Sequence, residues 1–147
     1  MSSERPWLAH YPAGVPAEID LDEFASINDI FDSAVQKYRD KTAFISMGKS
    51  ITYGELERLS RDFAGYLLGE LKLKKGDRVA IMMPNCLQYP VAILGVLRAG
   101  LTVVNTNPMY TARELKHQLV DSGASVLVVM DNFGNVAQEV LVQVPGV

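Results

Sequence analysis

The sequence predicts an α/β fold, in which helices flank a layered and mostly parallel sheet. Three runs of the chain are predominantly apolar, as expected of strands that are covered on both faces of a parallel sheet. They span residues 78–83, 101–104 and 125–130. Segments with helical periodicity or helix-capping signals alternate with these runs, and this alternation is typical of sheets with right-handed crossovers. The length of 147 residues fits one domain of ordinary size.

Residues 1–25 are expected to form an irregular N-terminal arm, and residues 26–147 an α/β subdomain. The arm contains three prolines without periodicity, together with Trp7 and Tyr11. Large apolar side chains gain by leaving water, so we expect the arm to pack on its own domain or on another chain. It has no apolar run of the kind that marks a secretory signal peptide.

A helix and a hairpin are predicted to follow the arm. Residues 27–38 place apolar side chains on one helical face, and Ser26 stands where an N-cap belongs. Residues 42–46 and 50–53 are β-prone runs on either side of the gap Met47-Gly48-Lys49, and they predict a β-hairpin.

Two capping boxes, each a threonine followed three residues later by a glutamate, predict two further helices. The box that begins at Thr52 opens a helix expected to end near 74–76. The box that begins at Thr111 opens a helix expected to end at Ser122-Gly123. The remaining helices are predicted over 89–98, before Gly100, and from Asp131-Asn132 to about Val142.

Three loops at the carboxyl ends of the predicted strands are candidates for ligand binding, because ligands of open parallel sheets bind there. These loops are Pro84-Asn85, Asn105–Pro108 and Asp131-Asn132. Their asparagine side chains could hydrogen-bond a ligand, or they could serve as turn formers and caps, and for each residue taken alone we favour the turn role.

Signals for nucleophilic, metal or nucleotide chemistry are weak. Cys86 follows a strand end, where a reactive thiolate is one option, but a buried structural cysteine is favoured. His117 and Glu114 share one helical surface, and such a pair is usually solvated. The segment 48–50 resembles the end of a phosphate-binding loop, yet Ala43 stands where that motif needs glycine and a strand follows, so a hairpin turn is favoured.

Charge and cysteine content limit the function classes. There are 14 Lys and Arg against 17 Asp and Glu, a formal charge of -3, which argues against a general nucleic-acid binder. The single cysteine cannot form an internal disulfide, which favours a reducing cytoplasm. The uncharged run between Arg78 and Arg98 is interrupted by Pro84 and Pro90, so a buried strand, turn and helix are favoured over a membrane span.

A small basic cluster lies where the second helix is expected to end. It consists of Lys72, Lys74, Lys75 and Arg78. Complementing the dipole of that helix is one role for these residues, and attracting phosphate or anionic lipid is another.

Several stretches together resemble the beginning of adenylate-forming enzymes, specifically the bacterial long-chain fatty-acid–CoA ligases. The matching stretches are 51–56, 76–85, 97–101 running into 104–111, and 114–124. Even the arm, with Trp7-Leu8 and Tyr11-Pro12, is similar to how such ligases begin. The resemblance implies that the chain is part of the large N-terminal domain of the adenylate-forming fold.

The resemblance also implies a two-step reaction for the full-length protein. ATP and a fatty acid would give an acyl-adenylate, with Mg²⁺ assisting, and CoA would then displace AMP. The family's phosphate loop, metal-binding acidic residue and C-terminal lysine have no counterpart in these residues. No catalytic, cofactor-binding or metal-binding residue is therefore assigned, and this fragment alone is expected to be inactive and to hold no cofactor.

The resemblance and the arm together suggest a homodimer. The location expected is cytoplasmic, with peripheral association at the inner membrane as a further option, and no nucleic acid is expected as partner. Two rival interpretations stay open: a self-standing α/β binding module that uses the strand-end loops, and an oligomeric scaffold built through the arm.

Overall fold

The structure, a computed structural model, describes residues 5–147, so the first four residues of the expected arm lie outside it. Its centre is a parallel sheet in the order β4-β3-β5. The strands are β3 (Arg78–Met82), β4 (Thr102–Thr106) and β5 (Val126–Val129). Val79 pairs with Val103 on one side and with Val126 on the other, which confirms the predicted parallel sheet.

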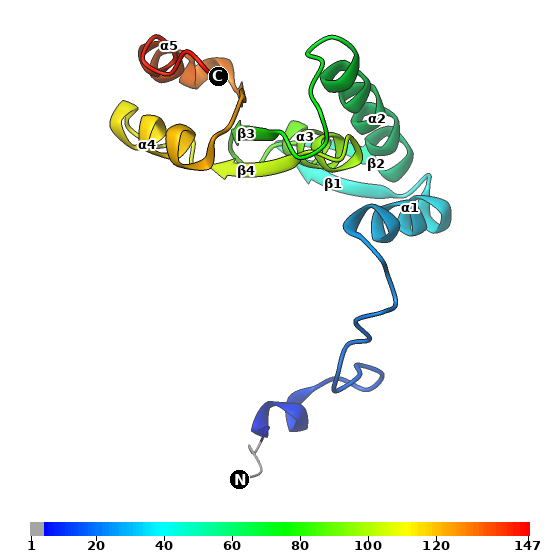
Figure 1. Cartoon of the computed structure of the whole chain (residues 1–147). Helices are drawn as coiled ribbons and strands as arrows, with labels where there is room; N and C mark the ends of the chain where they lie inside the picture. Colours follow the sequence, from blue (N-terminus) through cyan, green and yellow to red (C-terminus); the bar gives the residue numbers. More distant parts are fainter. Residues whose placement is uncertain (1–4) are drawn as a thin grey trace.

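Both faces of β3 are buried because helices cover them. Successive side chains of a strand point to opposite faces. Val79 and Ile81 pack with α2 (Tyr53–Gly69) and α3 (Gln88–Arg98). Ala80 and Met82 pack with α4 (Ala112–Ser122) and α5 (Gly134–Leu141), which lie side by side in Figure 1. This two-sided burial explains why the strand is apolar from Val79 to Met82.

A smaller core joins the hairpin to the first helix. The elements are α1 (Ile27–Tyr38), β1 (Thr42–Ser46) and β2 (Lys49–Thr52), with β1 and β2 antiparallel. Phe31 and Val35 of α1 pack with Ile51 and Leu56. Met47 and Gly48, with φ of 51° and 73°, form the turn between the strands, as the hairpin interpretation of residues 48–50 predicted.

The predicted caps are present at three helix starts. Ser26 accepts a hydrogen bond from the backbone N–H of Asp29. In each capping box the threonine hydroxyl accepts from the glutamate N–H, at 3.1 Å for Thr52 and 3.4 Å for Thr111. The glutamate carboxylate accepts from the threonine N–H in return, so two otherwise unpaired donors are satisfied at each helix start.

Helix α2 ends at Gly69, five residues or more before the position expected from the sequence. The N–H groups of Glu70 and Leu71 both donate to the carbonyl of Tyr66, which closes the last turn, and Lys72 then takes a left-handed φ of 55°. The last turn of α2 contains no basic residue, so the proposed pairing of the basic cluster with this helix dipole is wrong.

Two other boundaries differ from expectation. Strand β4 extends to Thr106, because Asn105 and Thr106 pair with Ile81 and Met82 instead of belonging to the loop. The segment Asp131–Phe133 forms a 3-10 turn, η2, and α5 begins only at Gly134.

The described part of the arm runs away from the α/β body (Figure 1). It contains one 3-10 helix, η1 (Pro6–His10), in which no residue is buried. Trp7 is 53% exposed and Leu21 80%. Its own domain therefore does not cover the arm, contrary to the first of the two packing arrangements expected from the sequence.

Candidate functional site

Two of the three candidate loops meet at the carboxyl edge of the sheet. Pro84-Asn85 follows β3 and Asn107-Pro108 follows β4, and these strands are neighbours. Together with Tyr89 they line an open cavity of about 390 Å³. The third loop, Asp131-Asn132, forms η2 beyond β5 and is not among the residues that line this cavity.

Hydrogen bonds fix the polar groups around this cavity. The Tyr89 hydroxyl donates to Oδ1 of Asn105 at 2.8 Å. The Gln118 side chain, from α4, donates to the Asn105 carbonyl at 2.9 Å. Oδ1 of Asn107 accepts from the N–H of Met109 at 2.9 Å, which is the turn role favoured from the sequence.

Tyr89 and Gln118 are residues of this site that sequence reasoning missed. Tyr89 lies in the first turn of α3, four residues after Asn85. Its position directly after a candidate loop is the signal in the sequence that could have indicated it. Gln118 lies on α4 and meets Asn105 only because the crossover returns α4 to the strand. The site offers neutral amides and a hydroxyl, which can orient a ligand by hydrogen bonds.

Cys86 is half-buried rather than buried. Its thiol lies 4.0 Å from the Met130 sulfur and packs on the core beside α3. It also lines an apolar pocket of about 490 Å³ between the hairpin and α3, with Phe44 and Ile93 among its neighbours. This packing fits the structural role favoured for the cysteine.

His117 and Glu114 line one open groove of about 820 Å³ on α4, as their spacing predicted, and both are exposed. The N–H and hydroxyl of Thr111 hydrogen-bond the Glu114 carboxylate and hold its pKa below the ordinary value. Among residues 5–147, no three His, Cys, Asp or Glu side chains gather in a way that could hold a metal ion. The residues described here therefore do not fit a Mg²⁺ site.

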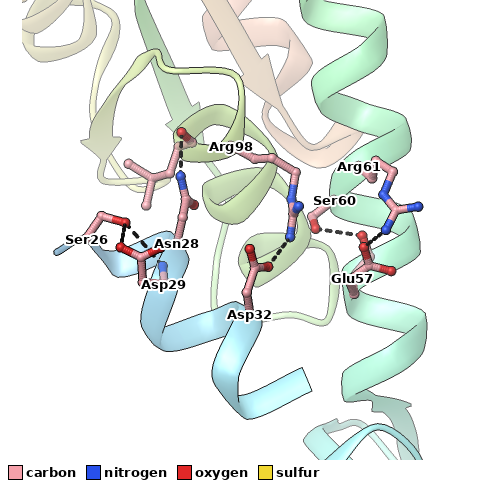
Figure 2. Close-up of polar contacts among 9 residues, drawn as sticks. Ser26, Asn28, Asp29, Asp32, Glu57, Ser60, Arg61 and Arg98 are labelled. Carbon is pink, nitrogen blue, oxygen red and sulfur yellow. Dashed lines mark hydrogen bonds and ion pairs between the residues drawn. The ribbon is translucent and has the colours of Figure 1, made fainter. Parts of the chain in front are cut away.

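Polar contacts between helices hold the scaffold that carries the site (Figure 2). The Arg98 guanidinium pairs with Asp32 of α1 at 2.9 Å. The Asn28 side chain donates to the Leu97 carbonyl at 3.2 Å. Both contacts tie α1 to the end of α3, so they fix the helix whose other end carries Tyr89.

Comparison with known proteins gives the family. A family model described as AMP-binding enzyme matches residues 31–145, which is more than half of the chain. The chain belongs to the AMP-binding enzyme family. Within this family it is similar to the long-chain-fatty-acid–CoA ligase of Yersinia pestis, with 55% identity over 94% of this chain and 25% of the relative. The ligase of the same name from Bacillus subtilis is 40% identical over 89% of this chain and 23% of the relative.

Solved structures give the same result for the fold. A benzoate CoA ligase from Burkholderia xenovorans superposes with a TM-score of 0.73 and 29% identity, over 78% of this chain and 23% of that one. The α/β fold expected for an adenylate-forming enzyme is thus confirmed. This AMP-binding enzyme chain spans about a quarter of the length of the curated relatives it matches. Within its described residues, no helix has the length and apolar character that crossing a membrane requires.

Proposed function

We propose that the chain is the N-terminal portion of a long-chain fatty-acid–CoA ligase. The observation that carries the proposal is the 55% identity to such a ligase over 94% of the chain. The full-length protein would join a fatty acid carboxylate to the α-phosphate of ATP and release pyrophosphate. The CoA thiol would then attack the acyl carbon, so that acyl-CoA forms and AMP leaves.

Within that enzyme, residues 26–147 serve as a scaffold and residues 1–25 as an arm. The family's phosphate loop and lysine have no counterpart in these residues, so the catalytic groups would belong to other parts of the full-length protein. Mg²⁺ would supply charge neutralisation on the phosphates there. Its ligands would also come from elsewhere, because the described residues of this chain do not form a metal site.

The arm supports a homodimer as the assembly. Trp7, Val15 and Ile19 are 53%, 49% and 78% exposed, and their own domain leaves them uncovered. Apolar side chains gain by leaving water, and exchange of a terminal segment between copies is a low-cost route to a dimer. A cytoplasmic enzyme with peripheral membrane association completes the proposal, because long-chain fatty acids partition into membranes.

A self-standing binding module is the second candidate. The cavity beside Tyr89 and Asn105 favours it, since ligands of parallel sheets bind at this edge. The identity to ligases over nearly the whole chain supports the first proposal more strongly.

The deciding experiment compares two proteins. Acyl-CoA formation from palmitate, ATP, Mg²⁺ and CoA is measured for the protein from the complete reading frame and for residues 1–147 alone. We expect turnover from the first and none above a blank from the second. Absence of turnover from the first would refute the ligase assignment, and turnover from the second would refute the scaffold role.

A further inference from the structure

We propose that an exposed basic corner between α2 and β3 binds the surface of anionic lipid membranes. The basic corner consists of Leu68, Leu71, Lys72, Lys74 and Lys75. The inference deepens the peripheral membrane association proposed above and depends on it.

The apolar part of the basic corner is a pair of leucines at the end of α2. Leu68 is 43% exposed and Leu71 is 39% exposed, although most leucines of this chain are covered. Leu68 lies in the last turn of α2 and Leu71 lies two residues beyond its end at Gly69, so two exposed apolar side chains directly precede the lysines in the chain. An apolar spot next to lysines is the combination that inserts into the boundary between lipid headgroups and acyl chains.

The lysines of the basic corner outnumber the two acidic side chains next to them in the chain, Glu70 and Asp77. Lys72, Lys74 and Lys75 are exposed, and among residues 5–147 none of them forms an ion pair. Of the acidic groups nearby, Asp77 accepts the backbone N–H of Lys74 at 2.7 Å, and Glu70 is exposed. A local cluster of lysines complements a negatively charged surface, although the net charge of the whole chain is -3.

The basic corner is held in place by the sheet. The Gly76 N–H donates to the Gly100 carbonyl at 3.1 Å, and the Asp77 carbonyl accepts from Thr102 at 2.8 Å. The left-handed conformation of Lys72, with φ of 55°, turns the chain sharply after the helix. A fixed loop loses little conformational freedom when it docks, which favours binding.

The location of the basic corner leaves the candidate site free. It precedes β3 and therefore lies at the amino edge of the sheet, whereas the cavity beside Tyr89 lies at the carboxyl edge. A membrane bound at one edge does not cover the other. The enzyme can thus dock on a lipid surface with its ligand edge open.

The test measures vesicle binding by the protein from the complete reading frame. The probes are vesicles of phosphatidylcholine alone and of an equimolar mixture with phosphatidylglycerol, and binding is read by co-sedimentation. We expect binding to the mixed vesicles only, weakening as salt is raised because salt screens the charges. The variant Lys72→Glu/Lys74→Glu/Lys75→Glu is expected to bind roughly 10-fold or more weakly, since each lysine contributes to the attraction.

Matched controls separate the basic corner from general charge and hydrophobicity. Lys37→Glu/Lys41→Glu/Lys49→Glu changes the net charge equally at exposed positions elsewhere and should bind like the parent protein. Leu68→Ser/Leu71→Ser should weaken vesicle binding. The control Val120→Ser/Val142→Ser, at two exposed apolar positions elsewhere, should not.

Three results would overturn the proposal. The protein could fail to bind vesicles, or the corner and control variants could lose vesicle binding equally. Gel filtration could also show that the parent protein is a dimer and that the corner variant is a monomer, so that the corner joins two copies. Ligase turnover on dissolved substrate is measured for every variant. A protein that keeps turnover but fails to bind vesicles refutes the lipid surface alone, and loss of turnover in the parent refutes the proposed function.

Discussion

The Tyr89 hydroxyl donates a hydrogen bond of 2.8 Å to Oδ1 of Asn105, and so joins the first turn of α3 to the carboxyl end of β4. Asn105 is exposed and Tyr89 half-buried, so water competes for both groups. The contact therefore orders the rim of the cavity more than it stabilises the fold.

Removing that hydroxyl should have a small, measurable effect. We expect Tyr89→Phe to lower the free energy of unfolding by about 0.5–1 kcal/mol, the usual net contribution of one hydrogen bond. Asn105→Ala tests the same contact from the other side, and in a double-mutant cycle the two changes should be non-additive. Additive effects in urea denaturation would show that the pair is not coupled.

Gly95 is predicted to be intolerant of a side chain. A Cβ there would lie 2.7 Å from Cδ1 of Phe63 and 3.0 Å from the Ser60 carbonyl, where α2 and α3 pack. Overpacking costs about 1–3 kcal/mol and the gain in helix propensity returns about 1 kcal/mol, so we expect Gly95→Ala to destabilise the protein. The control is Gly65→Ala, since nothing lies within 4 Å of that position and propensity alone should stabilise it.

The capping boxes make stability depend on acid pH. The N–H and then the hydroxyl of the capping threonine hold the pKa of Glu55 and of Glu114 below the ordinary value. Their contribution to stability is complete above the unfolded-state pKa and is lost as the pH falls through the lowered folded-state pKa. Glu55→Gln/Glu114→Gln should therefore show a smaller fall of Tm on acidification than the parent protein, and an identical fall would contradict the assignment.

The ion pair between Arg98 and Asp32 should contribute modestly. Asp32 is 50% exposed, so solvent screens the pair, and Asp32→Ala should cost about 0.5–1 kcal/mol. Arg98→Ala should cost more, because the guanidinium also lies 5.8 Å from the centre of the Phe31 ring. Thermal unfolding of both variants checks the order, and a larger loss from Asp32→Ala would reverse it.

Deleting the arm tests the proposed homodimer. We expect light scattering to report at least twice the 16.2 kDa of the chain for residues 1–147, because Trp7 and its neighbours would be covered by a second copy. Removal of residues 1–16 should then give a monomer. A parent chain that is already monomeric, and unchanged by the deletion, would refute the exchange of arms.

Much of the fold follows from local signals in the sequence. Thr52 and Thr111 begin their helices where the capping boxes predict, because a cap depends on residues only three apart. The predicted end of α2 near residues 74–76 is wrong, because the chain leaves the helix at Gly69. Where the sequence has no strong stop signal, packing decides where a helix ends. Here the segment after α2 packs Leu73 against the core.

The candidate site was only partly predictable for a related reason. The strand-end rule places Asn85 and Asn105 at the same edge of the sheet, where both line one cavity, since it needs only the strand direction. The contact of Gln118 with Asn105 depends on how α4 crosses over the sheet, which no local pattern encodes. Cys86 is half-buried instead of buried, because it lines the open pocket between the hairpin and α3.

The strand order β4-β3-β5 constrains how the nascent chain can fold on the ribosome. The hairpin with α1 and α2 can assemble early, since its partners are close in sequence. Strand β3, though central, is synthesised before both of its neighbours, and its second edge stays open until Val126–Val129 has emerged. An open apolar edge invites pairing with other chains. Synthesis that pauses between Thr106 and Val126 would therefore expose this segment to aggregation or to chaperones.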